Sequence, residues 1–226
     1  MSNSFKRSIK ELKFTFKPKE TVDTLAMMYF LNYAIGIIGA LLSKFGLPDT
    51  SPDFSLNGSV LFNTFTFISV VILAPIFEEL IFRGMILNTL TKYNKMFAII
   101  VTSLLFGLLH LNITQAIPAF FMSLVLCYMY VQTDSMLVTI LAHAGNNFLA
   151  LMSAYSNNIL ISVLVLALVI YGLITVILKS KEVNAFIKEE KTSENWYARF
   201  FKQIPNLLYL IFTILWIIIS LFINMF

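Results

Sequence analysis

The sequence predicts an all-α membrane protein, a polytopic bundle of about seven to eight transmembrane helices in one domain over residues 1–226. Hydrophobic residues make up 58% of the chain and charged residues 12%, against about 25% charged residues in a soluble domain. The mean hydropathy is +0.83. Apolar runs near the ~20 residues that a spanning helix needs recur along the whole chain. They fall near 22–44, 59–92, 97–111, 116–132, 136–153, 159–178 and 207–226.

The flanks of these runs indicate how they are joined. Residues 1–21 form a basic cytoplasmic tail, and no small-residue cleavage site follows the first run, so we expect it to remain as a signal-anchor. The run 59–92 is too long for one perpendicular span, and Pro75 is expected to kink or divide it. Residues 45–58, which contain prolines and glycines, form the longest predicted outward loop. Residues 179–206 are polar enough to be a cytoplasmic loop or an interfacial helix.

The positions of the basic residues predict the orientation of the chain. Lysines and arginines gather in the N-terminal tail, in the short loop at 92–95 and in the segment 179–206. If the N-terminus is cytoplasmic and each run crosses once, all three groups lie on the cytoplasmic side, as the positive-inside rule requires. Topology therefore explains the net charge of +4 without a nucleic-acid partner. We expect a multi-pass protein of the cell membrane, and the Asn-, Lys-, Ile- and Phe-rich composition suggests a bacterial source.

The second run contains two adjacent glutamates and an arginine, Glu78, Glu79 and Arg83. A charged side chain at the centre of a bilayer costs roughly 3 kcal/mol or more, so such a residue is a candidate functional group by default. Glu79 and Arg83 stand at positions i and i+4, share one face of a helix and are expected to form an ion pair. Glu78 lies about 100° further round the helix and is therefore expected to point elsewhere.

The two histidines of the chain also lie in apolar runs. His110 follows Phe106 by four residues, and His143 precedes Asn147 by four residues. At 1.5 Å per residue, Glu78, His110 and Asn147 all lie ~20 Å from the nearest predicted cytoplasmic turn. We therefore expect three helices to present polar groups at a similar depth. His143 and Asn147 share a face and offer two hydrogen-bond donors, which is the arrangement that an oxyanion hole requires.

These residues form three short motifs in a fixed order: Glu78-Glu79-x-x-x-Arg83, Phe106-x-x-x-His110 and His143-x-x-x-Asn147. In this order they resemble the motifs of the CPBP family of intramembrane glutamic endopeptidases. That family, also called Abi, comprises CAAX prenyl proteases and bacteriocin-processing or immunity proteins. The resemblance covers roughly residues 59–153, which we expect to be the catalytic core. Each motif alone is weakly specific, whereas three in order in a polytopic chain are strongly specific.

The resemblance implies a helical bundle with an intramembrane cavity that faces the cytoplasm. It implies that Glu78 and His110 activate a water molecule, and that His143 and Asn147 hold the oxyanion. The remaining motif residues, Glu79, Arg83 and Phe106, are expected to support the site by pairing and packing. We therefore predict an endopeptidase that cleaves a peptide or a membrane-anchored substrate within the lipid bilayer and uses no cofactor.

Other functions fit parts of the same pattern. Two histidines and a glutamate could ligate Zn²⁺, although the sequence has no His-Glu-x-x-His motif. Intramembrane glutamate and histidine also build proton relays in transporters, but no internal repeat is visible here. A non-catalytic bacteriocin-immunity or scaffold protein that binds a peptide would keep the motifs as well. The single cysteine, Cys127, excludes an intrachain disulfide and a cysteine metal cluster.

Overall fold

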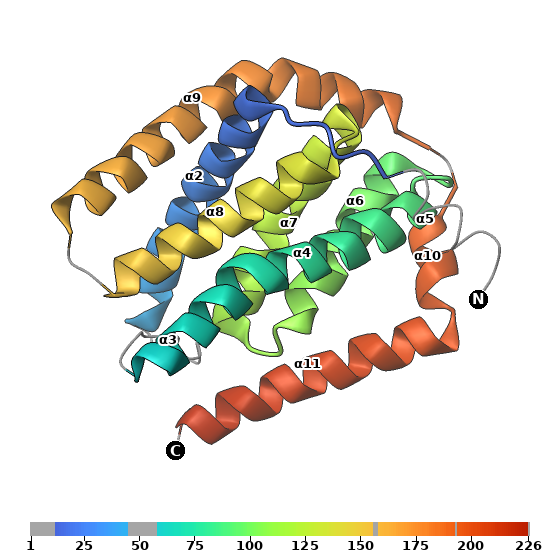
Figure 1. Cartoon of the computed structure of the whole chain (residues 1–226). Coiled ribbons are helices and arrows are strands. Elements are labelled where there is room, and N and C mark those ends of the chain that lie inside the picture. The colour runs from blue at the N-terminus through green and yellow to red at the C-terminus, as the bar shows by residue number, and fades with distance from the viewer. Residues whose placement is uncertain (1–11, 45–57, 156–157, 193, 226) are drawn as a thin grey trace.

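A computed structural model describes residues 12–44, 58–155, 158–192 and 194–225, and every regular element in these residues is a helix. The all-α prediction is therefore confirmed. Most of the predicted loop 45–58 lies outside the described residues. The elements, which Figure 1 shows in chain order, are α2 (Pro18–Ser43), α3 (Val60–Phe67), η1 (Ile68–Leu73), α4 (Ala74–Glu79), η2 (Leu80–Leu87), α5 (Asn88–Leu90), α6 (Lys95–Leu109), α7 (Ile113–Thr133), α8 (Met136–Tyr155), α9 (Ile159–Glu189), α10 (Trp196–Phe201) and α11 (Ile204–Met225).

Several of these helices are long and apolar enough to cross a membrane, so the chain is a membrane protein. In the part of the chain that the structure describes, five helices meet this criterion, and α6 is apolar but shorter. α2 corresponds to the first predicted run and packs against α7, α8 and α9. The five helices that are long and apolar enough to cross a membrane are Val60–Leu90, Ile113–Thr133, Met136–Tyr155, Ile159–Glu189 and Ile204–Leu221.

The second predicted run is one continuous helix, Val60–Leu90, and it is not divided at Pro75. Two π-helical turns, η1 and η2, flank α4, and Pro75 lies in the first turn of α4. At the end of η1 the backbone N–H of Ala74 donates to the carbonyl of Ser69, five residues earlier. This wider winding just before Pro75 accommodates a residue that has no N–H to donate. Of the two expected effects of Pro75, a kink or a division, the division is therefore wrong: the helix changes its winding near Pro75 and continues.

The N-terminal residues 12–17 form an extended strap across the turn between α7 and α8. The backbone N–H of Met136 donates to the carbonyl of Lys13 at 2.8 Å. The ammonium of Lys13 also pairs with the carboxylate of Asp134, and this hydrogen bond and the negative charge raise the pKa of the ammonium. The strap and the α7–α8 turn therefore lie at the same end of the bundle.

The turn between α5 and α6 lies at the same end of the bundle. Asn94 is the N-cap of α6, where its side chain accepts from the backbone N–H of Phe97 at 2.8 Å. The same side chain donates to the carbonyl of Glu190, which follows α9, at 2.8 Å. Leu12 of the strap packs on an apolar cluster that includes Phe97 and Phe186. The described parts of the predicted basic segments thus share one end of the bundle.

The region predicted as a polar connector, 179–206, contains more helix than a simple loop. α9 continues to Glu189, and the short helix α10 follows at Trp196–Phe201. The rings of Trp196 and Tyr93 lie 5.2 Å apart, so α10 packs against the α5–α6 turn. The described part of this region is therefore largely helical, and an interfacial location for α10 stays a prediction.

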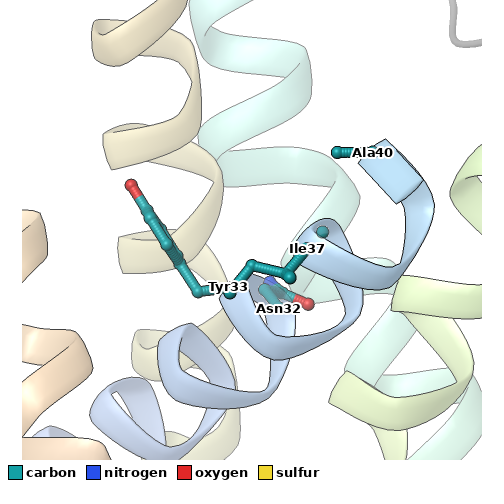
Figure 2. Close-up of a pocket in the computed structure, with 5 residues that line it drawn as sticks. Asn32, Tyr33, Ile37 and Ala40 are labelled. Atoms are coloured by element: carbon teal, nitrogen blue, oxygen red, sulfur yellow. The ribbon is translucent and has the colours of Figure 1, made fainter. Parts of the chain in front are cut away.

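A groove of about 390 Å³ runs along α2, and the residues that line it share one face of that helix (Figure 2). The groove lies in the half of α2 that is remote from the strap, and its lining contains no motif residue. It is therefore not the cavity that the resemblance implies around Glu78. The lining residues are Asn32, Tyr33, Gly36, Ile37 and Ala40.

Candidate active site

The charged residues of the first motif lie inside the bundle, where α4 and η2 approach α7 and α8. Glu79 ends α4 and Arg83 lies one turn later in η2, and both side chains are 0% exposed. Nη1 of Arg83 donates to Oε1 of Glu79 at 2.9 Å. The predicted ion pair is confirmed. Pairing is what allows either charge to be buried in an apolar interior, because an unpaired buried charge is strongly destabilising.

Two further groups hold the guanidinium of Arg83. Its Nη2 donates to the hydroxyl of Ser123 in α7 at 2.7 Å and to the carbonyl of the same residue at 3.4 Å. Its Cζ lies 4.9 Å from the centre of the Phe106 ring, within the range of a cation–π contact. Ser123 is fully buried, and our sequence analysis missed it. The only available signal was an isolated hydroxyl in the apolar middle of α7.

His143 of α8 lies between the two glutamates. Its Nδ1 is 2.9 Å from Oε1 of Glu79, the same oxygen that Arg83 binds. Its Nε2 is 3.8 Å from Oε2 of Glu78, which is ion-pair range but too long for a direct hydrogen bond. The first and third motifs are thus in direct contact, and one imidazole faces both carboxylates.

Glu78 differs from its neighbour in exposure. Its side chain is 27% exposed, whereas that of Glu79 is 0% exposed. Arg83 and His143 both bind Glu79, and among the described residues no hydrogen bond joins the Glu78 carboxylate to another side chain. Of the two adjacent carboxylates, Glu78 is therefore the one that a water molecule or a substrate can reach. This is the division that their positions on the helix predict.

His110 lies at the C-cap of α6, and its side chain is only partly buried. Its Nδ1 is 3.1 Å from the carbonyl of Phe106. Because a carbonyl only accepts, Nδ1 carries the proton and Nε2 is left as an acceptor in the neutral ring. The Phe106 ring contacts both imidazoles, with ring centres 5.3 Å from His110 and 5.9 Å from His143. Within the described chain no direct hydrogen bond joins His110 to Glu78.

Asn147 is fixed by two contacts of its own. Its Nδ2 donates to the carbonyl of Val70 in η1 at 2.9 Å, and its Oδ1 accepts from Nδ2 of Asn146 at 3.2 Å. A side-chain amide has two N–H groups, so the bond to Val70 leaves one N–H available. The side chain of Asn146, the preceding residue, thus orients the amide of Asn147.

The structure therefore joins the three motifs in different ways. Glu79 of the first motif contacts His143 of the third motif directly. The Phe106 ring of the second motif contacts Arg83 of the first motif and His143 of the third. Asn147 lies one turn beyond His143 on α8. Within the part of the chain that the structure describes, no group of three or more His, Cys, Asp or Glu side chains is arranged to hold a metal ion.

Comparison with family models matches residues 60–149 to the family described as type II CAAX prenyl endopeptidase Rce1-like. None of the curated proteins and none of the solved structures that were compared matches the chain. The matched segment contains every residue of the three motifs and lies within the predicted core, 59–153. The resemblance that the motifs indicated is confirmed for this segment.

Proposed function

Because residues 60–149 match the type II CAAX prenyl endopeptidase family, we propose that the protein is an intramembrane endopeptidase whose water molecule is activated by Glu78 and His110. The observation that supports this best is the unequal state of the two adjacent carboxylates. Glu79 is buried inside the bundle and bound by Arg83, whereas Glu78 keeps a partly exposed carboxylate beside His143. A reachable carboxylate within an otherwise apolar interior suits a general base.

In the proposed reaction Glu78 takes a proton from water while the water oxygen attacks the carbonyl carbon of the peptide bond. His110 shares this water, because its Nε2 is the acceptor that the bond from Nδ1 to Phe106 leaves free. As the tetrahedral intermediate collapses and the carbon–nitrogen bond breaks, the proton that Glu78 took from water passes through Nε2 of His110 to the nitrogen of the leaving amine. The products are a new carboxylate and a new amine, and the reaction uses no cofactor.

The proposed oxyanion site uses Asn147 and His143. The free N–H of the Asn147 amide is held in place by the bond to Val70 and by Asn146. His143 presents Nε2 on the side of Glu78, where the attacked carbonyl would lie. Donors that are already oriented before the reaction stabilise the charge that develops in the transition state.

The proposed substrate is a peptide or a membrane-anchored protein that reaches Glu78 from the end of the bundle where the basic residues gather. We propose that this end is cytoplasmic, because lysines and arginines concentrate on the cytoplasmic side of membrane proteins. The protein would then be a multi-pass component of a bacterial cell membrane.

The experiment is a mass-spectrometric search for new termini on candidate peptides that are co-expressed with the protein. The candidates are a small precursor peptide encoded beside the gene and a CAAX-terminated peptide with and without its prenyl group. Glu78→Gln keeps the shape of the side chain and removes the base, so turnover is expected to fall by about 10²–10⁴-fold. Glu182→Gln, on an exposed stretch of α9, is the matched control and should cleave like wild type.

Three results would contradict the proposal. Turnover by Glu78→Gln at the wild-type rate would exclude Glu78 as the base. Absence of new termini with wild-type protein, together with unchanged peptide binding in the Glu78→Gln variant, would favour the non-catalytic immunity or scaffold function. Loss of cleavage on addition of a chelator would instead point to the Zn²⁺ peptidase.

A further inference from the structure

The interior of the bundle contains a continuous chain of polar contacts that runs from α7 to the accessible carboxylate. Ser123 binds Arg83 at 2.7 Å, and Arg83 binds Glu79 at 2.9 Å. Glu79 binds Nδ1 of His143 at 2.9 Å, and Nε2 of His143 lies 3.8 Å from Glu78. The first three links join residues whose side chains are at most 5% exposed, so bulk water does not compete for them.

The third link decides where His143 carries its proton. Glu79 is a carboxylate because it is paired with the guanidinium of Arg83, and a carboxylate only accepts hydrogen bonds. The bond of 2.9 Å therefore requires an N–H at Nδ1 of His143. In the neutral ring the other nitrogen, Nε2, then has a lone pair, and it faces Glu78.

The first link decides whether that geometry is maintained. An arginine side chain has several rotatable bonds, and hydrogen bonds restrict its rotamers. Among the described residues, Ser123 is the one outside the Arg83 helix that forms hydrogen bonds with the guanidinium. Fixing Nη2 on α7 leaves Nη1 aimed at Oε1 of Glu79, and this contact in turn holds the oxygen that binds His143.

We propose that Ser123 is a positioning residue that acts through Arg83 and Glu79 to fix His143 in the tautomer with its proton on Nδ1, so that Nε2 faces Glu78. The inferred tautomer and orientation of the His143 ring hold whether or not the protein is a peptidase. The consequence of this tautomer for catalysis rests on the proposed function. His143 can donate from Nε2 to an oxyanion only as an imidazolium, whose positive charge then stabilises the negative charge that develops on the oxyanion.

The test is a nitrogen NMR measurement on full-length protein labelled with ¹⁵N-histidine and purified in lipid nanodiscs through a histidine-free tag. The chain has only two histidines, so in the variant His110→Gln every histidine signal comes from His143. At a pH where the ring is neutral, Nδ1 is expected to resonate as a protonated nitrogen and Nε2 as an unprotonated one. A neutral ring with its proton on Nε2 would overturn the proposal.

The role of Ser123 is tested in the same background. Ser123→Ala is expected to cause loss of the single Nδ1–H species and appearance of the Nε2–H tautomer, and Ser123→Thr, which keeps the hydroxyl, is expected to restore it. Ser103→Ala is the matched control. Ser103 and Ser123 are equally buried and both contact Cys127, at 3.7 Å and 3.8 Å, but among the described residues only Ser123 binds Arg83. An unchanged tautomer in Ser123→Ala would contradict the positioning role.

The first measurement needs no Ser123 variant, so a failure of Ser123→Ala to fold leaves the tautomer itself testable. The outcomes are also separable from those of the proposed function. An Nδ1–H tautomer in a protein that cleaves nothing would support this inference and refute the peptidase. An Nε2–H tautomer in an active peptidase would refute this inference and support the proposed function.

Discussion

Removing the guanidinium of Arg83 is expected to destabilise the protein more than any substitution of an exposed charge. In Arg83→Met the Glu79 carboxylate keeps its bond to His143 but loses its counter-charge in a site that is 0% exposed. Leaving one member of a buried ion pair without its partner costs about 3–5 kcal/mol. For a chain of this size, 1 kcal/mol corresponds to roughly 2–4 °C in Tm, so the expected decrease is about 6–20 °C.

The assay is thermal unfolding of purified protein in lipid nanodiscs, with Arg199→Met as the matched control. Arg199 also pairs with a glutamate, Glu194, at 2.8 Å, but the two side chains are 64% and 48% exposed. An exposed pair contributes about 0–1 kcal/mol, so the control should melt close to wild type. The double variant Glu79→Gln, Arg83→Met removes both charges and is expected to melt above Arg83→Met alone. If Arg83→Met melted within about 2 °C of wild type, the burial argument would be wrong.

Three further outcomes are expected. Asn147→Ala should lower kcat by about 10²–10³-fold with KM changed only a few-fold, because an oxyanion donor acts mainly in the transition state; an increase in KM alone would assign Asn147 to substrate binding. Gly172→Ala should lower Tm, because a Cβ there would lie 2.0 Å from a backbone oxygen of α2, and a Tm equal to that of wild type would show that α9 shifts freely. In a Cys127→Ser background, Glu190→Cys should react with an impermeant thiol reagent only from the cytoplasm and Pro52→Cys only from outside; the reverse pattern would invert the proposed orientation.

Local spacing in the sequence predicted part of the site correctly. The ion pair of Glu79 and Arg83 follows from their i, i+4 positions, since residues four apart on a helix are neighbours. The different exposure of Glu78 follows from the same helical geometry. The apolar runs predicted the helices, because a segment that crosses a bilayer must satisfy its backbone hydrogen bonds internally.

The contacts that depend on how helices meet were not available from spacing. Ser123 reaches Arg83 across 40 residues, and its position in the sequence does not show which face of α7 points inward. His143 was expected beside Asn147, but the packing of α8 on α4 brings its ring between both glutamates. The bond from Asn147 to Val70 depends on the wide winding of η1, which no residue pattern in that apolar segment indicates.

The strap of residues 12–17 has a consequence for the order of assembly during translation. Lys13 pairs with Asp134, 121 residues later in the chain, and the strap also accepts a bond from Ser135. At about 5–20 residues per second the ribosome needs roughly 6–24 s to synthesise the intervening chain. During that interval the residues that bind Lys13 and Thr15 have not yet been made, although the strap has already left the ribosome. The earliest part of the described chain therefore completes its contacts only after α8 has begun to emerge, and a bulky N-terminal fusion would act on this late step.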